Sequence, residues 1–296
     1  MHTDFLDINE SRLDEIIAYA QELVAKTGHV SVIKVYNDKR IGCELMGVDS
    51  PIMLFSLFQL FAADEILARS YPQLRHLSKS KAEQGNRGIV NEVIAYIKNK
   101  AAPCTYQELG DYFVDGLGYN EQSVYLAATR KQRIYTYVQS CVIHRDTIGW
   151  DEEKQKQVEE IAHSIFAESV SAGKCFGLIN SILENYSLPD LGSGLYWTRP
   201  LLVDILISQG RFRVLGNRKN AFVPIPNNLN IETFDDLLCE LLKRNHLGSA
   251  NLESFGDDLR EQGIVIKSVT ESMLGKSRKV RIDGKEILLK ELAYNA

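Results

Sequence analysis

The side chains of this sequence with the most evident binding chemistry are basic and amide residues in three stretches. Arginine and glutamine can donate to base edges, whereas lysine, threonine and tyrosine can hold phosphate oxygens. The resulting candidates for contact with duplex DNA are Gln122, Tyr125, Thr129, Arg130, Lys131, Arg133, Arg211, Arg213, Arg218, Lys219, Lys276, Arg278 and Lys279. Each stretch is expected on a helix or in a hairpin, where such side chains could reach a groove or a phosphate backbone.

The first stretch lies on a predicted helix that begins after Asn120. Gln122, Tyr125 and Thr129 share one face of this helix, opposite Val124, and three basic residues follow. A polar face of this kind suits the major groove of duplex DNA. The alternative is a solvated helix whose basic end complements the helix dipole.

The other two stretches are expected in hairpins. Residues 211–215 and 221–225 read as strands around the polar turn 216–220. Their four basic side chains suit phosphate or minor-groove contact. A turn charged for solubility is the alternative, and Asp204 on the preceding helix would repel phosphate. The third stretch, 276–285, is basic but has acidic residues among and beside its cations, so a DNA patch and a solvated surface are both open.

Three motifs resemble parts of catalytic signatures but lack residues that the chemistry requires. His-Arg-Asp at 144–146 is not followed by the asparagine or the Asp-Phe-Gly of a kinase. Glu-Glu-Lys at 152–154 lacks a preceding catalytic strand, and Gly-Ser-Gly at 192–194 lacks the remaining glycine of a dinucleotide site. Histidines and cysteines show no metal-ligand spacing. The sequence therefore predicts no catalytic residue, no metal and no cofactor.

Composition limits the class of protein further. The chain has 296 residues, of which 45% are hydrophobic and 25% charged, and its net charge is −5. This balance is ordinary for a globular protein and opposes a surface that coats nucleic acid throughout, although a local basic face is compatible with it. Five scattered cysteines indicate reduced thiols. Without a signal peptide or a long apolar run, we expect a soluble, cytoplasmic protein that does not contact the membrane.

The elements that must position these residues follow one recurring order, which is three helices and then two β-rich stretches joined by a polar turn. In the second copy, Pro103 ends the first helix, and Thr105 caps the next with Glu108 as its capping-box partner. In the third copy, Thr198 is expected to cap the last helix. The predicted helices are 12–26, 89–101, 105–115, 120–131, 151–172, 176–185, 198–208, 231–244, 252–261 and 268–274, and the further predicted strands are 134–140, 141–147, 279–282 and 286–289.

The first copy departs from this order, because no hairpin is evident in it. Its segment Ile52–Phe61 is apolar nearly all round, and a helix of that kind is buried against something. We therefore expect the first copy to pack on other modules or to dimerise.

The sequence thus predicts a mainly α fold with short β-hairpins (α+β), built of tandem winged helix-turn-helix modules. The expected modules are a helical N-terminal module, a degenerate winged helix (1–85), a winged helix (86–150), a winged helix with a basic wing (151–228) and a C-terminal winged helix (229–296). Residues 88–148 resemble the HARE-type winged helices of transcription and restriction proteins, on the segments Pro103–Leu109 and Val124–Leu126. The resemblance implies a winged-helix fold for that module.

Two main hypotheses for function follow. The first is a non-enzymatic protein of tandem winged helices that binds duplex DNA as a regulator or targeting subunit. The second is a protein-interaction scaffold within a larger complex, and a non-catalytic fragment of a larger nucleic-acid enzyme is a further alternative. A homodimer or a protein partner is expected at the N-terminal module. Basic residues of several modules on one face would favour DNA, and an apolar face would favour a protein.

Overall fold

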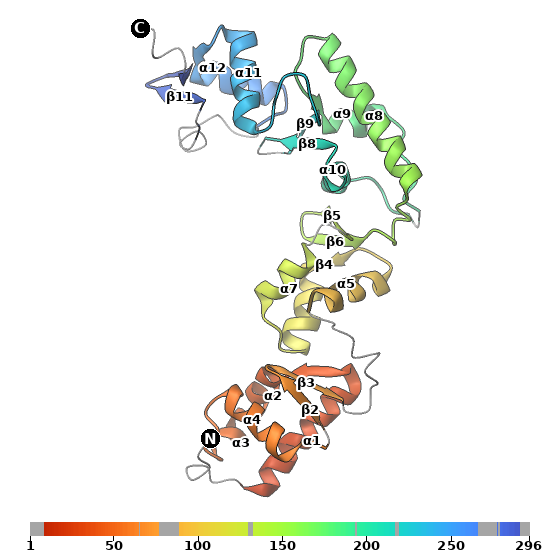
Figure 1. Ribbon diagram of the computed structural model, residues 1–296, viewed down its shortest axis with the longest axis vertical. Coiled ribbons are helices and arrows are strands. Elements are labelled where there is room, and N and C mark those ends of the chain that lie inside the picture. The colour runs from red at the N-terminus through yellow and green to blue at the C-terminus, as the bar shows by residue number, and fades with distance from the viewer. Residues whose placement is uncertain are drawn as a thin grey trace. The chain divides into compact units, whose positions relative to one another are not determined.

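The computed structural model describes residues 9–64, 66–76, 89–129, 133–192, 194–216, 219–265, 277 and 279–290. Two compact units, Met1–Arg130 and Lys131–Ala296, divide the chain. The protein is mainly helical and contains four small antiparallel sheets of three strands each (Figure 1). The predicted α+β fold with repeated helix-then-hairpin units is therefore confirmed. Among the described helices, none has the length and apolar character needed to cross a membrane.

The first unit opens with repeat one, which has helices, a short strand and a hairpin. Its elements are α1 (Glu10–Thr27), β1 (His29–Ser31), α2 (Val32–Asp38), α3 (Arg40–Glu44), α4 (Pro51–Phe61), β2 (Ile66–Ser70) and β3 (Gln73–His76). The strands pair in the order β1-β3-β2. The sequence did not predict this hairpin, so repeat one follows the common plan more closely than expected.

The core of repeat one is formed by buried residues of α1, α2, α4 and the three strands. Every third or fourth residue of α1 is apolar and buried, as an amphipathic helix requires. In α4, by contrast, Leu54, Phe55, Leu57 and Phe58 are buried, whereas three further large apolar residues are 52–61% exposed. These three are Ile52, Leu60 and Phe61. One face of α4 therefore remains open within the described residues, and the expectation that repeat one packs on other modules or dimerises stays a prediction.

The first unit continues with the repeat-two helices. They are α5 (Ile89–Lys100), α6 (Tyr106–Leu109), the π-helical turn η2 (Gly110–Gly116) and α7 (Glu121–Ala128), with the short strand β4 (Cys104–Thr105) after α5. The Thr105 hydroxyl accepts from the Glu108 N–H at 3.1 Å, and the Glu108 carboxylate accepts from the Thr105 N–H at 2.7 Å. Asn120 accepts from the Ser123 N–H at 3.1 Å. The predicted capping box and the predicted Asn120 cap are confirmed.

The second unit holds the remaining elements. They are β5 (Ile134–Val138), β6 (Cys141–His144), α8 (Glu152–Ser171), β7 (Gly177–Leu178), α9 (Ile179–Asn185), α10 (Arg199–Ser208), β8 (Phe212–Leu215), β9 (Ala221–Pro224), α11 (Phe234–His246), β10 (Ser249–Asn251), α12 (Leu252–Glu261), β11 (Val280–Asp283) and β12 (Glu286–Leu289). All three predicted hairpins form here, and Thr198 caps α10 through the Leu201 N–H at 3.3 Å. The helix expected at 268–274 lies outside the described residues.

A short strand that the sequence did not reveal completes each repeat. β7 pairs with β9, and β10 pairs with β12, so that both sheets have the same strand order as repeat one. The short strand follows the first helix and hydrogen-bonds to the last strand of the hairpin, which fixes the hairpin against the helices. These repeated units are consistent with winged-helix modules.

Candidate binding surfaces

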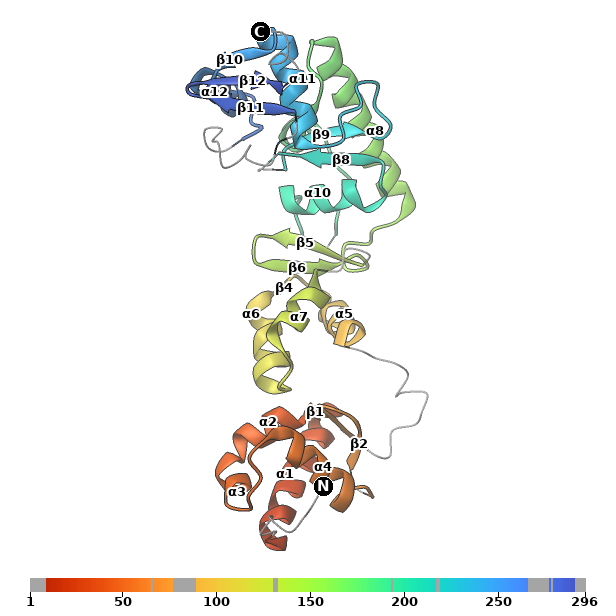
Figure 2. The ribbon, with the colours of Figure 1, turned by 60° about the vertical axis from the view of Figure 1, so that its left-hand side comes forward.

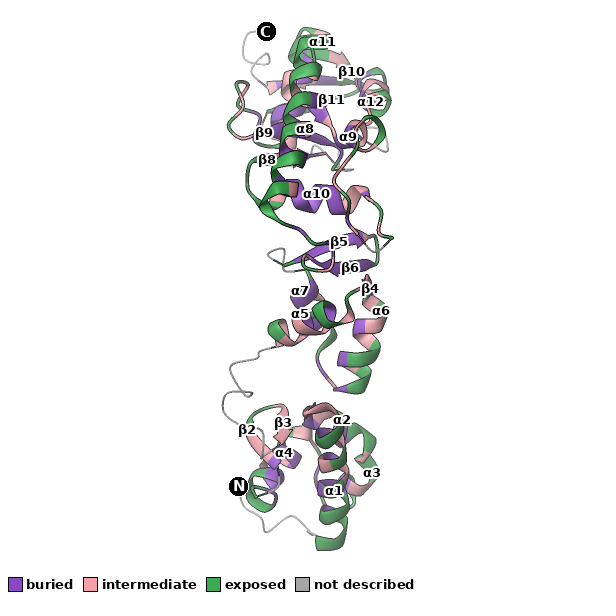
Figure 3. Ribbon diagram, turned by 90° about the vertical axis from the view of Figure 1, so that its right-hand side faces the viewer, coloured by how far each residue is buried: buried purple, intermediate pink, exposed green. Residues whose placement is uncertain are grey.

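Helix α10 is the last helix before the hairpin of its repeat, and it is buried nearly all round. Its six successive residues Leu201–Leu206 are all buried. The views in Figures 2 and 3 place α10 between the strands β8 and β9 of its own repeat and the β5–β6 hairpin. A helix in such a position cannot enter a DNA groove without losing one of these two protein surfaces.

Polar contacts fix the hairpin onto α10. The Thr136 N–H donates to the Asp204 carboxylate at 2.8 Å, and the Thr198 hydroxyl donates to the Tyr137 carbonyl oxygen. The hairpin residues Tyr135, Tyr137, Cys141 and Ile143 are part of one apolar core with α8, α9 and α10. Asp204, which the sequence suggested as a carboxylate that repels phosphate, therefore serves as an acceptor for the hairpin backbone.

Two of the four cations predicted to bind DNA from the second hairpin, Arg211 and Arg213, make contacts within the fold. The Arg211 guanidinium lies 2.7 Å from the carboxylate of Glu159, whose side chain is 6% exposed. Arg213 donates to the Ile231 carbonyl oxygen at 3.4 Å and lies 3.7 Å from a Glu232 oxygen. Lys219 is exposed on the turn, and Arg218 lies outside the described residues.

The C-terminal basic patch also contains a cation paired within the fold. The Lys279 ammonium contacts the carboxylate of Asp236, which is the capping-box residue of α11. Burial raises the pKa of Asp236, but hydrogen bonds from Lys279, Thr233 and the Glu232 backbone outweigh burial and lower the pKa to about 2. Lys279 therefore neutralises an almost buried acid. The predicted Lys276 and Arg278 lie outside the described residues.

The predicted polar face of α7 lies at a shallow hollow in the first unit. Gln122, Tyr125 and Thr129 line this hollow of about 280 Å³ together with Glu121 and Leu126. Gln122 and Thr129 are exposed, and Leu126, an apolar residue, is 61% exposed. The hollow is thus a mixed apolar and polar surface. Of the basic residues expected beyond α7, Arg130 and Lys131 are not described, and Arg133, in the second unit, is exposed.

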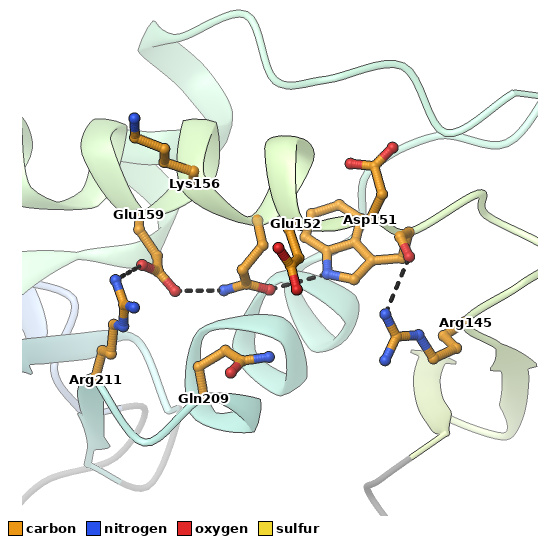
Figure 4. A pocket seen from close by; sticks show the side chains of 9 residues that line it. Arg145, Asp151, Glu152, Lys156, Glu159, Gln209 and Arg211 are labelled. Carbon is orange, nitrogen blue, oxygen red and sulfur yellow. Dashed lines mark hydrogen bonds and ion pairs between the residues drawn. The ribbon is translucent and has the colours of Figure 1, made fainter.

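A polar pocket of about 550 Å³ opens beside the start of α8 in the second unit (Figure 4). Its lining residues are Arg145, Trp150, Asp151, Glu152, Gln155, Lys156, Glu159, Gln209 and Arg211. One chain of hydrogen bonds runs along its wall. The Trp150 indole N–H donates to Gln155 at 2.9 Å, and Gln155 donates to Glu159 at 2.8 Å, whose other oxygen pairs with Arg211.

The charges of this pocket do not favour an anion. Asp151 caps α8 and Glu152 opens it, so that the N-terminal end of the helix dipole already has acidic neighbours. Both carboxylate oxygens of Glu159 accept from the chain itself. We interpret the pocket wall as a structural network that joins α8 to the strand β8. Sequence reasoning missed it because Glu159 and Arg211 are 52 residues apart.

Neither metal-ligand geometry nor the comparisons with known proteins assign a chemistry to these surfaces. Within the described ranges, no group of three or more histidine, cysteine, aspartate or glutamate side chains could hold a metal ion. No protein-family model matches the chain, and no curated protein matches it.

Proposed function

We propose that this chain is a non-catalytic interaction scaffold of tandem winged-helix units, whose third helices pack against protein. The observation that carries the proposal is the burial of α10 beneath the β5–β6 hairpin. In DNA-binding winged helices the corresponding helix lies in the major groove. Here a protein hairpin occupies that side of the helix.

The same reasoning extends to α7. Asn120 and Thr198 cap α7 and α10 in the same way, each accepting from the N–H three residues further on. Counted from these caps, Leu126 takes the place of Asp204, which holds the hairpin. The α7 hollow is therefore the equivalent of a surface that a β-hairpin covers elsewhere in this chain, and its exposed leucine fits a protein partner better than a phosphate backbone.

Repeat one supplies further exposed apolar side chains. Ile41 on α3 is 76% exposed, and Leu45, the residue that follows the end of α3, is 57% exposed. On α4, Ile52, Leu60 and Phe61 are also more than half exposed. Large apolar side chains left exposed together on one helix, as on α4, mark sites of protein interaction. The three on α4 support the expectation that the N-terminal module meets a protein partner.

Duplex DNA binding is the second candidate function, and one observation favours it. Gln122 and Thr129 are polar, exposed and on one face of α7, where base readout would need them. The described cations of the predicted DNA set weigh against it, since Arg211, Arg213 and Lys279 already face acidic side chains.

A salt series with duplex DNA tests the proposal. We expect Arg211→Ala to leave the slope of log affinity against log salt unchanged, because the Arg211 guanidinium is paired with the Glu159 carboxylate. The same variant should lower the free energy of unfolding by about 1 kcal/mol, the upper end for a pair with one exposed partner. In a protein that already carries Glu159→Gln, Arg211→Ala should lower the free energy of unfolding by clearly less than it does in the wild-type protein. A slope flattened by about one unit would instead mean that Arg211 contacts a phosphate.

A further inference from the structure

The exposed face of α7 has a large apolar side chain at its centre. Leu126 is 61% exposed and lines the hollow of about 280 Å³, with residues of α7 and its C-cap as the other lining. Complete burial of a leucine side chain is favourable by about 1.5–3 kcal/mol. Pockets for small molecules are usually larger, at about 300–1,000 Å³, and are more enclosed. The hollow therefore suits a side chain that another protein inserts.

The chain around this hollow is acidic. Residues 101–129, which include β4, α6, η2 and α7, contain four carboxylates and no lysine, arginine or histidine. Glu108 pairs with Lys100 of the preceding helix. The other three carboxylates are exposed, and no lysine or arginine of the described residues pairs with them; they are Asp111, Asp115 and Glu121. The next cations in the sequence, Arg130 and Lys131, follow α7 and lie outside the described residues.

The acidic side chains and the hollow lie on elements that pack together. Helix α7 packs against η2, and the rings of Tyr106 on α6 and Tyr125 on α7 meet edge to face with centroids 5.3 Å apart. Glu121 is part of the lining of the hollow, where its carboxylate accepts from the Tyr125 hydroxyl. A partner that covers Leu126 therefore meets a carboxylate beside it. Such a surface attracts lysine and arginine and repels phosphate.

The polar groups of α7 favour a helix over a strand as the partner segment. On α10, the Asp204 carboxylate accepts from the Thr136 N–H of β5, which is the edge strand of its sheet. Counted from the helix caps, α7 has Leu126 in that place, and leucine offers no acceptor. An edge strand on α7 would leave an N–H without a partner, at a cost of about 1–3 kcal/mol. A helix satisfies its backbone groups internally and can dock through an apolar stripe.

We propose that α7 binds a basic amphipathic helix of a partner protein. The helix inserts a large apolar side chain at Leu126 and places lysine or arginine beside Glu121. This inference rests on the proposed scaffold function and adds the chemistry of the partner. Salt weakens the complex, because the charges involved are exposed and are screened beyond about 8–10 Å. The apolar contact at Leu126 remains at high salt.

Fluorescence anisotropy with two matched peptides and the full chain tests the proposal. Each peptide is a helix of about 18 residues with leucines along one face, and the other face carries lysines in one peptide and glutamates in the other. The lysine peptide should bind at least about tenfold more tightly than the glutamate peptide. Leu126→Gln should weaken binding of the lysine peptide about tenfold, because a buried leucine side chain is lost from the interface.

Two charge reversals show whether the peptide binds beside Glu121 or is attracted by the net charge of the protein. Glu121 and Glu253 are both exposed in the first turn of a helix, so that Glu121→Arg and Glu253→Arg change the net charge equally. Glu121→Arg should weaken binding of the lysine peptide about fivefold, since an attraction becomes a repulsion. Glu253→Arg, on α12, should change that affinity less than about twofold.

The outcomes separate this inference from the scaffold function. Equal affinity for the two peptides, lowered in both cases by Leu126→Gln, would overturn the basic partner and leave the scaffold function standing. Equal effects of Glu121→Arg and Glu253→Arg would also overturn the inference, as would a lysine peptide that does not bind. Labelled duplex DNA that binds the wild-type chain, and binds more weakly after Leu126→Gln, would contradict both proposals.

Discussion

Val203→Lys should destabilise the second unit by at least about 4 kcal/mol, which is enough to unfold a protein of ordinary stability. Val203 is 3% exposed and belongs to the core that α10 shares with the β5–β6 hairpin. An ammonium group placed there would be buried without an opposite charge designed for it. In a DNA-reading winged helix, a substitution on the groove-facing side of the third helix would change affinity and leave the fold intact.

The matched control is Leu126→Lys on α7. Counted from the helix caps, Leu126 takes the place of Asp204, the residue next to Val203, and it is 61% exposed. A lysine there should change the free energy of unfolding by no more than about 0.5 kcal/mol. Urea unfolding followed by circular dichroism measures both variants. Tryptophan fluorescence isolates the second unit, because both tryptophans, Trp150 and Trp197, lie in it. Equal stability of the two variants would show that α10 is not held between two protein surfaces.

Gly118→Ala should break the junction between repeat one and the repeat-two helices. Gly118 has a φ of +72°, and a Cβ atom there would lie 2.7 Å from the Lys34 Cβ and 3.0 Å from the Lys34 backbone nitrogen. The left-handed conformation costs about 1–2 kcal/mol for a residue with a side chain, and overpacking adds about 1–3 kcal/mol. Because the clash involves backbone, movement of a side chain cannot relieve it.

Hydrogen exchange of the Ser31 amide provides the readout for this variant. That N–H donates across the junction to Leu117, so undocking should increase its exchange. Gly110→Ala is the control, because no atom outside its own helical turn lies within 4 Å of the added Cβ and its φ is negative. The Ser31 amide should keep its protection in the control. Protection that is also retained in Gly118→Ala would contradict the described approach of the two repeats.

Much of the local structure could be predicted because its causes lie within a few residues. The caps at Thr105, Asn120 and Thr198 follow from side chains that accept from an N–H three residues further on. The turn at Gly284 follows from the preference of Asp-Gly for tight hairpins. Such signals depend on backbone geometry alone and are independent of what the element packs against.

The features on which the proposed function rests could not be predicted in this way. The sequence showed an apolar stripe on α10, but the burial of Val203 and Asp204 depends on a hairpin more than 60 residues earlier. The partner of Arg211 is equally remote in sequence, so its stretch resembled a basic DNA surface. The hairpin of repeat one was missed because consecutive polar residues, Arg69 and Ser70, end its first strand without an alternating pattern.

The packing of α10 also indicates how the proposed scaffold would hold its parts in order. A solenoid buries each repeat against its neighbour, so that stability accumulates along the chain. In the second unit, one hairpin and one third helix from successive segments share a single core. On α7, no hairpin covers the third helix within the described part of its unit. We expect partners to bind at third-helix surfaces of this kind.

Site-specific photocrosslinking at Leu126 tests the central claim most directly. A benzophenone amino acid is placed at Leu126 in the full-length protein in its own cells, and at Val170 as a control, because Val170 is an apolar residue 46% exposed on α8. After illumination, the scaffold account predicts an adduct at Leu126 that proteases digest and nucleases leave unchanged, and that exceeds the adduct at Val170. An adduct that nucleases shorten, or no adduct above that at Val170, would contradict the account.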